Sequence, residues 1–206
     1  NNKKGFFAGI SSCPPLLSVS SFDPPNGPFN CEKLNERVLN FIKMNKIKNI
    51  ILVARWSYYT HGDFKQQDIR FLKTKTFAQK DLESSKKAFN QGLKRTIETY
   101  EKLGVNVIII KQYPQQRINP KDLFYRKFNE SNLSELIKKY SISKEQNSEI
   151  NYFANNLFSN VSYESFNLID FSPSFCSSKC LMGDQDGSYY YDDDHLSDYG
   201  MSLISD

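Results

Sequence analysis

The chain has 206 residues, which is enough for one domain with a substantial hydrophobic core. Its composition is that of a globular protein, with 39% hydrophobic and 24% charged residues and a net charge of only +4. Because this charge is small and no basic run alternates with aromatic residues, we expect no nucleic-acid partner. No apolar run approaches the roughly 20 residues that a membrane-spanning helix needs. The sequence shows neither a signal peptide nor an initiator methionine, so we expect it to be part of a longer protein.

Apolar residues along the chain alternate between helical spacing and continuous runs. Helical spacing predicts helices around residues 34–42, 89–103, 133–140 and 151–158. Continuous apolar runs predict strands at 50–54, 105–110 and 166–170. Gly104 is expected to end the second of these helices, as the residue just after its last turn. Strands that are apolar throughout are typical of a parallel sheet buried on both faces, so we expect a single α/β domain over residues 1–206.

Four cysteines form two local pairs. Cys13 and Cys31 flank a proline-rich loop, and Cys176 and Cys180 close a tight turn. Zinc is the alternative, but the spacing lacks the paired C-x₂-C knuckles of structural zinc sites. We therefore favour two disulfides and hence an oxidising compartment. On the chain-entropy model, the Cys13–Cys31 bridge is worth roughly 3 kcal/mol and the shorter bridge less.

The segment 191–200 contains the most informative motif. Asp192 stands three residues before His195, which is one of only two histidines. A carboxylate that orients an imidazole supplies two of the three groups that make a serine nucleophilic. The alternative interpretation is an acidic turn followed by a helix with its N-cap at Ser197. Asp193 and Asp194 compete with Asp192 as the orienting acid.

The block 192–200 resembles the last motif of SGNH-type serine esterases and acyltransferases. Residues 10–16, 53–59 and 112–114 and the pair Cys176/Cys180 extend this similarity. Together they resemble the SGNH domain that is fused behind bacterial membrane acyltransferases of the type-3 family, which O-acetylate surface glycans. The motifs follow the expected strands, as functional residues of an open parallel sheet do. The resemblance spans nearly the whole chain and implies a flavodoxin-like three-layer α/β sandwich of SGNH hydrolase type with a parallel sheet.

One departure from the family concerns the nucleophile. In the family, this residue is the serine of a Gly-Asp-Ser block at the end of the first strand. No Gly-Asp-Ser occurs here, and neither Gly62-Asp63 nor Gly183-Asp184 is followed by serine. Residues 5–10 resemble the family's second strand, so we expect the first strand and its serine upstream of Asn1. In the strand order 2-1-3-4-5 the missing strand lies between residues 6–10 and 50–54, where we expect a gap or an outside segment.

Two residues occupy the position where related hydrolases often carry the asparagine of the oxyanion hole, and neither is a direct substitute. Arg55 is expected either to bind a polarised oxygen or a glycan carboxylate, or to form a salt bridge at the strand end. Trp56 is expected either to floor a sugar or acyl pocket or to pack against the proline-rich loop. By the resemblance, Gly9 or the backbone at Ser11-Ser12 supplies an oxyanion N–H.

A metal site is not favoured. Residues 184–187 faintly resemble a calcium loop, but they lack a third acidic ligand and a distal glutamate. A hairpin turn at Asp186-Gly187 explains this segment better. His61 is expected to be a loop residue, and it lies far from His195 in the sequence.

The resemblance implies O-acyl transfer, most simply O-acetyl transfer, to a cell-surface polysaccharide or glycan. His195 and Asp192 would activate the upstream serine, and an associated membrane acyltransferase domain would deliver the acyl donor. No coenzyme motif is visible, so no cofactor is expected. The implied location is periplasmic or otherwise extracytoplasmic, with the full-length protein tethered to the inner membrane. The alternatives are an O-acetylesterase that uses water as the acceptor and a non-catalytic glycan-binding module with a decayed triad.

Overall fold

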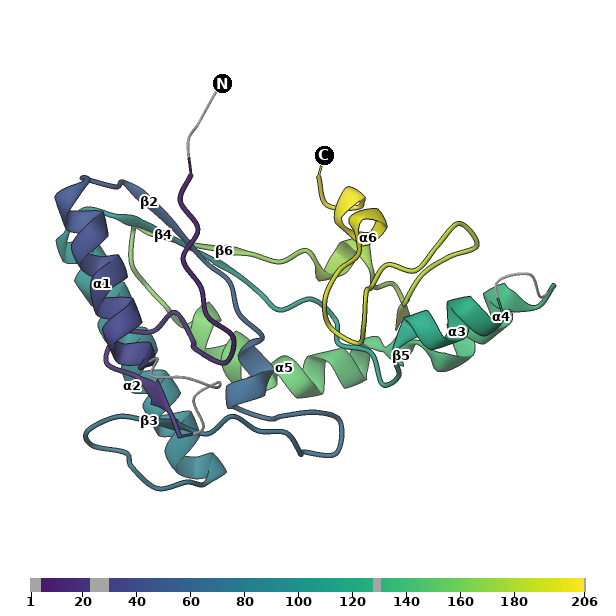
Figure 1. Ribbon diagram of the computed structural model, residues 1–206, viewed down its shortest axis with the longest axis horizontal. Coiled ribbons are helices and arrows are strands. Elements are labelled where there is room, and N and C mark those ends of the chain that lie inside the picture. The colour runs from purple at the N-terminus through teal and green to yellow at the C-terminus, as the bar shows by residue number, and fades with distance from the viewer. Residues whose placement is uncertain (1–4, 23–29, 128–130, 206) are drawn as a thin grey trace.

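The computed structural model describes residues 5–22, 30–127 and 131–205. Its main sheet is parallel and has three strands in the order β2-β4-β6 (Figure 1). These strands are β2 (Asn49–Leu52), β4 (Asn106–Ile110) and β6 (Phe166–Ile169). Two antiparallel pairs of two-residue strands lie outside this sheet: β1 (Ser20–Ser21) with β3 (Leu72–Lys73), and β5 (Ile142–Ser143) with β7 (Lys179–Cys180). The parallel strands coincide with the three apolar runs of the sequence.

Helices connect the strands of the main sheet. The α-helices of the described residues are α1 (Cys31–Met44), α2 (Leu82–Lys102), α3 (Pro120–Lys127), α4 (Leu133–Tyr140), α5 (Lys144–Ser159) and α6 (Asp198–Ser202). The short 3₁₀ helices are η1 (Trp56–Tyr59), which follows β2, and η2 (Ser172–Ser174), which follows β6. The sequence predicts α1, α2, α4 and the second half of α5, and it misses α3.

Local polar contacts fix the ends of the long helices. The side chains of Asn30 and Asp81 accept backbone N–H groups in the first turns of α1 and α2, at 2.8 and 2.7 Å. Ser143 and Gln146 form a capping box at the start of α5, so this helix begins earlier than its apolar stripe indicates. Gly104, with φ of +65°, follows α2 in the left-handed conformation expected of a glycine at this position.

One face of the main sheet carries the main core. Leu52, Val107 and Ile109 are buried on it, together with apolar side chains from α1, α2 and α5. The opposite face is open at β2, where Ile51 is 58% and Val53 53% exposed. The α/β class with a parallel sheet is confirmed, but in the described residues the helical layer at β2 covers one face only. The expectation that every strand is buried on both faces is therefore wrong for β2.

Residues 5–10 do not form the expected strand. They are irregular, and the side chains of Phe6 and Phe7 are 74% and 96% exposed. Within the described residues β2 pairs with β4 alone, so no ladder joins residues 5–10 to β2 and one edge of β2 is unpaired. The physical reason is that an extended segment becomes a strand only when a neighbouring strand accepts and donates its backbone hydrogen bonds.

A second, smaller core lies at the other end of the molecule from α1 (Figure 1). It joins α3 and α4 to the chain that follows β6, and it is rich in aromatic residues. Its buried members are Leu123, Phe124, Leu133, Ile137, Phe175, Met182, Tyr189 and Tyr190. The last two precede the acidic segment 192–194, so this core fixes the chain that leads to the motif of Asp192 and His195.

Two disulfides fix the loops near the sheet. Cys13 bonds to Cys31 at the start of α1, and Cys176 bonds to Cys180, so both predicted pairs are confirmed. Asn35 of α1 adds two hydrogen bonds of 2.9 Å to backbone carbonyls of the loop that follows Cys13. Disulfides of this kind persist in oxidising compartments and mark the domain as extracytoplasmic. None of the helices in the described part of the chain combines the length and apolar character needed to cross a bilayer.

Candidate active site

The carboxyl ends of β2 and β4 are tied together by side chains. The indole N–H of Trp56, just after β2, donates to the carbonyl of Ile110 at the end of β4, at 2.8 Å. The backbone N–H of Ser57 donates to Oε1 of Gln112 at 2.8 Å. These two bonds fix the segment that contains Arg55 relative to the segment that follows β4.

The acidic loop at 192–195 is anchored to the segment that follows β4. The backbone N–H of Gln116 donates to the carbonyl of Asp193 at 2.7 Å, and Nε2 of Gln115 donates to the Asp193 carboxylate at 2.9 Å. The backbone N–H of Tyr191 donates to the carbonyl of His195 at 2.7 Å and closes the loop. Asp193 is therefore the anchor of the loop, which excludes it as the acid that orients His195.

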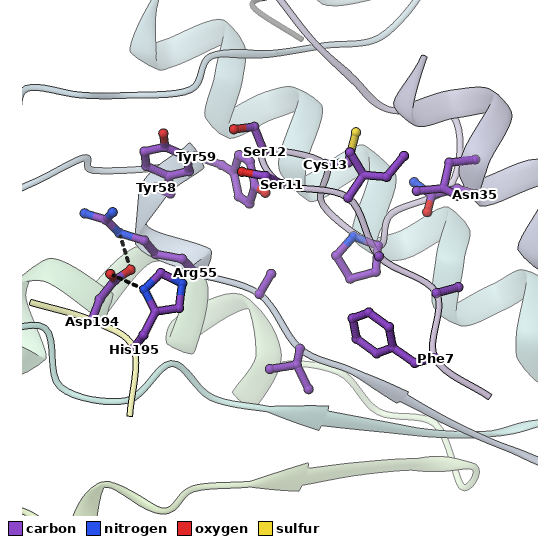
Figure 2. A pocket seen from close by; sticks show the side chains of 17 residues that line it. Phe7, Ser11, Ser12, Cys13, Asn35, Arg55, Tyr58, Tyr59, Asp194 and His195 are labelled. Atoms are coloured by element: carbon purple, nitrogen blue, oxygen red, sulfur yellow. Dashed lines mark ion pairs between the residues drawn. The ribbon is translucent and has the colours of Figure 1, made fainter. Parts of the chain in front are cut away.

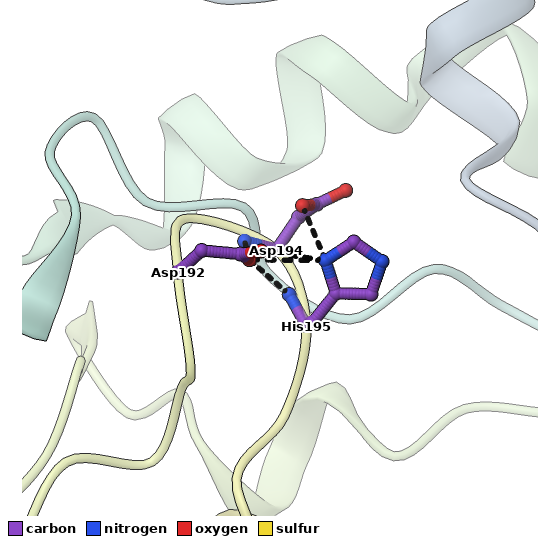
Figure 3. A group of neighbouring side chains, drawn as sticks. All are labelled: Asp192, Asp194 and His195. Carbon is purple, nitrogen blue, oxygen red and sulfur yellow. Dashed lines mark hydrogen bonds and ion pairs between the residues drawn. The ribbon is translucent and has the colours of Figure 1, made fainter.

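Asp192 holds His195 in the way that the sequence predicts. Its Oδ1 accepts the backbone N–H groups of Asp194 and His195 at 3.0 and 2.8 Å. Its Oδ2 lies 2.8 Å from Nδ1 of His195 (Figure 3). A carboxylate at Nδ1 favours the tautomer with its proton on that nitrogen and leaves the lone pair of Nε2 free. The ring is thus prepared to accept a proton at Nε2.

Asp194 links His195 to Arg55. One carboxylate oxygen of Asp194 lies 3.2 Å from Nδ1 of His195, and the other lies 3.2 Å from Nε of Arg55 (Figure 2). The guanidinium carbon of Arg55 also lies 4.8 Å from the ring centre of Tyr58 in η1. Of the two interpretations of Arg55, the salt bridge at the strand end is the one that the structure contains.

The charges around the loop shift its protonation equilibria. Burial alone would lower the pKa of His195, but the hydrogen bond to Asp192 and the charges of Asp194, Asp192 and Asp193 raise it above its ordinary value. Burial opposes ionisation of Asp192, but hydrogen bonds from the backbone of Asp194 and from His195 lower its pKa. Burial raises the pKa of Asp194, against the lowering effect of Arg55 and His195.

A cavity of about 480 Å³ opens beside this group (Figure 2). His195, Asp194 and Arg55 lie along one side, and the ring nitrogen of His195 that is not bound to a carboxylate is directed toward the cavity. The rest of the lining comes from residues 7–13, from Pro15, Leu34 and Asn35, and from Val53, Ala54, Tyr58 and Tyr59. The cavity therefore separates residues 7–13 from the segment that follows β2.

Gly9 and Ser12, the predicted oxyanion donors, both line the cavity. Within the described residues, neither backbone N–H donates to a protein acceptor. Ser12 also has a φ of 63°, in the left-handed region that is uncommon for residues other than glycine. No serine hydroxyl of the described residues donates to His195, although Ser11 and Ser12 line the same cavity.

The structure corrects both interpretations of Trp56 and confirms the hairpin turn expected within residues 184–187. Trp56 does not floor a pocket and does not pack on the proline-rich loop, because it is 1% exposed and contacts Phe89 and Phe158 in the main core. Residues 184–187 form the predicted hairpin turn, closed by the bond from Asp184 N to the carbonyl of Gly187 at 3.0 Å. The Asp184 carboxylate accepts hydrogen bonds within this hairpin and from tyrosine hydroxyls, so it is not a free calcium ligand.

One group of side chains in the described residues has the spacing of a metal site. The ligand atoms of Asp192, Asp194 and His195 lie within 4.8 Å of one another. We assign no ion to them, because the guanidinium of Arg55 already supplies the positive charge beside Asp194. His61 lies in the loop after η1 and belongs to no such group.

The sequence does not indicate the role of the glutamines after β4. Gln115 and Gln116 are 2% and 1% exposed, and they hold the acidic loop. The only signal is that three glutamines follow a buried strand within six residues, at the edge where functional side chains of such sheets gather.

The fold and the site are those of an α/β domain whose parallel sheet carries an aspartate–histidine pair beside its carboxyl edge. The family model described as "SGNH domain (fused to AT3 domains)" matches residues 1–206, and the chain belongs to this family. Comparison with curated proteins returns no match.

Among solved structures, the chain is similar to the periplasmic domain of a lipopolysaccharide acetyltransferase from Salmonella ser. Paratyphi A. The TM-score is 0.58 at 19% sequence identity, and the match covers 93% of this chain. It covers 66% of the other chain, so the present chain spans slightly less than two thirds of that structure. At this identity the likeness supports the fold, which agrees with the α/β fold predicted from the sequence.

Proposed function

We propose that this domain catalyses O-acyl transfer, most simply O-acetyl transfer, to a hydroxyl group of a cell-surface glycan. The observation that carries the proposal is the contact of 2.8 Å between Asp192 and Nδ1 of His195, with the other ring nitrogen directed to the cavity. Membership of the SGNH family supports acyl chemistry at this pair. The similarity to a lipopolysaccharide acetyltransferase domain supports a glycan as the acceptor.

In the proposed mechanism, a serine hydroxyl attacks the carbonyl carbon of the acyl donor and transfers its proton to Nε2 of His195. The bond to the leaving group breaks, and the leaving atom takes this proton from His195. A sugar hydroxyl then attacks the acyl-serine, His195 accepts its proton and returns it to the departing serine oxygen. Asp192 stabilises the imidazolium in both halves of the reaction. His195 begins and ends the cycle neutral.

We propose that the serine is supplied by a segment outside this chain, which adds as a strand to the free edge of β2. That edge has no partner in the described residues, where β2 pairs with β4 alone. A neighbouring strand lies roughly 4.8 Å from β2, on the side of the cavity. A serine at the carboxyl end of such a strand would enter the cavity beside His195.

The remaining roles follow from the same arrangement. The backbone N–H groups of Gly9 and Ser12 would donate to the developing oxyanion, since both line the cavity and neither has an acceptor in the described residues. An associated membrane acyltransferase domain would deliver the acyl donor. The SGNH domain itself would lie in the periplasm, tethered to the inner membrane in the full-length protein. None of the proposed steps uses a cofactor.

Water is the competing acceptor. The side chain of His195 is 75% exposed in the described structure, so water reaches it as easily as a sugar does. The alternative function is therefore a glycan O-acetylesterase, which uses the same residues. A glycan-binding module without catalysis is the second alternative.

The experiment uses the full-length protein, incubated with p-nitrophenyl acetate and analysed by peptide mass spectrometry. We expect an acetyl group on a serine outside residues 1–206 and none in His195→Gln. Acetylation of Ser11 or Ser12 would overturn the outside nucleophile but keep the acyl-enzyme. No adduct and no turnover in the native protein would favour the binding module. Addition of acceptor glycan then separates transfer, seen as acetylated glycan, from hydrolysis, seen as acetate alone.

A further inference from the structure

Nδ1 of His195 has two carboxylates beside it rather than one, and of the two contacts only that with Asp192 has the geometry of a hydrogen bond. Nδ1 is 2.8 Å from Oδ2 of Asp192 and 3.2 Å from Oδ1 of Asp194 (Figure 3). Only the Asp192 contact corresponds to the motif found in the sequence. The second contact brings in a residue directly adjacent to His195 along the chain.

Asp194 differs from Asp192 in how it is held. Its side chain is 10% exposed, against 42% for Asp192, and its second oxygen lies 3.2 Å from Nε of Arg55. Arg55 is itself held, because its guanidinium lies over the ring of Tyr58 and its backbone follows β2. A buried carboxylate is costly to ionise unless a cation is close by, and Arg55 provides that cation.

The charged groups that face the imidazole come from two elements. Asp192, Asp193 and Asp194 belong to its own loop, and Arg55 belongs to the segment after β2. Asp193 has the same charge as its neighbours, but its carboxylate binds Gln115 instead of the ring. The tyrosines of η1, Tyr58 and Tyr59, line the same cavity.

We infer that Asp194 is a second orienting carboxylate of His195 and that Arg55 is the positioning residue that holds it. Arg55 acts on the ring only through Asp194, so its effect is on the tautomer and the charge of His195. The inference deepens the proposed function and rests on it for its catalytic meaning. The orientation itself is a property of the folded chain, and it requires neither the nucleophile nor an acyl donor.

The test reads the tautomer of His195 by imidazole ¹⁵N NMR on the intact protein, above the pH at which the ring titrates. A His195→Gln variant, which lacks this ring, identifies its signals among those of the other histidines. Asp192→Ser removes the first carboxylate and keeps a short acceptor for the backbone turn. In this variant we expect the proton to stay on Nδ1, held by Asp194 alone.

Three double variants distinguish the effect of net charge from the effect of the contact between Asp194 and His195. Asp192→Ser with Asp194→Asn should move the proton to Nε2, the preferred position in an imidazole without a partner at Nδ1. Asp192→Ser with Asp193→Asn changes the net charge equally and should leave the proton on Nδ1. Asp192→Ser with Arg55→Gln should reduce the Nδ1 form, because Asp194 loses its counterion.

Two results would overturn the inference. If Asp192→Ser alone moves the proton to Nε2, Asp194 does not orient the ring. If Asp192→Ser with Arg55→Gln keeps the proton on Nδ1 in full, Arg55 does not hold Asp194. Should a double variant fail to fold, the titration midpoint of His195 in the single variants decides whether Asp194 acts on the ring. The titration midpoint of His195 must fall more in Asp194→Asn than in Asp193→Asn. An acyl-transfer failure with these NMR results intact would count against the proposed function alone.

Discussion

The indole N–H of Trp56 donates to the carbonyl of Ile110 across 2.8 Å, so a side chain after one strand satisfies the backbone at the end of the next. This bond sets the direction in which the chain leaves β2, and hence the place of Arg55 beside the acidic loop. The ring itself is 1% exposed and packs against Phe89 and Phe158. Trp56 is therefore a structural residue that positions the candidate site.

Replacing Trp56 tests this role. Trp56→Phe should cost about 1–3 kcal/mol, because the Ile110 carbonyl loses its donor and a gap remains. Trp56→Ala should cost about 3–5 kcal/mol. Urea unfolding measures both values. Phe7→Ala, at a ring that is 96% exposed, is the control and should stay within about 0.5 kcal/mol of the native protein.

The two faces of the main sheet should respond differently to truncation. Ile109→Ala on the covered face should destabilise the 206-residue chain by about 2–5 kcal/mol, because it leaves a cavity in the core. Ile51→Ala on the open face should cost less than about 1 kcal/mol, since Ile51 is 58% exposed. Equal losses in urea unfolding would mean that the open face of β2 is covered in solution.

Acyl transfer by the full-length protein should depend on pH through His195. The ring must be neutral to accept a proton, and the charges of its neighbours raise its pKa above the ordinary value of about 6.5. The rate should therefore rise with pH and reach half its plateau above about pH 6.5. Asp192→Asn removes the carboxylate that lies 2.8 Å from Nδ1 and should lower kcat, but by less than the about 10⁴-fold typical of losing the sole orienting acid, because Asp194 remains beside Nδ1. A pH profile of kcat/KM that is flat from pH 5 to 8 would contradict a role for His195 as the base.

Asp184 should contribute to stability at neutral pH and lose this contribution in acid. Burial favours its neutral form, but hydrogen bonds from Tyr199, Asp186, Tyr189 and Gly187 outweigh it and lower the pKa of Asp184. A lowered pKa in the folded state gives stability above the unfolded value of about 3.9 and removes it as the pH falls through the folded value. Unfolding free energies from pH 7 to 3 should therefore fall less steeply in Asp184→Asn. Parallel curves would show that the carboxylate is not linked to folding.

The two disulfides should differ in their contribution. The Cys13→Ser, Cys31→Ser double variant should lose roughly 3 kcal/mol, because it frees a loop of intermediate length. The Cys176→Ser, Cys180→Ser double variant removes a bridge that closes a far shorter loop, and it should lose less. Thermal unfolding of the oxidised protein and of both variants gives this order, and the reverse order would contradict the loop-length argument.

The sequence by itself determined the secondary structure of the sheet and the chemistry of the tail. The apolar runs predict β2, β4 and β6 because strands of a parallel sheet are rich in apolar side chains, and such runs are visible in the sequence alone. The pair of Asp192 and His195 is equally local, since three residues of separation let the carboxylate close a turn on the ring. The two disulfides were predicted for the same reason, because each joins neighbouring cysteines.

The tertiary structure decided whatever depends on contacts between distant segments. Residues 5–10 look like a strand in sequence, but a strand exists only with a partner, and none pairs with them in the described residues. Trp56 is next to Arg55 in the chain, yet one is buried in the core and the other lines the cavity. The contact of Arg55 with Asp194 joins residues 139 positions apart (194 − 55), and such a pairing follows from how the strands place their ends, which no local pattern encodes.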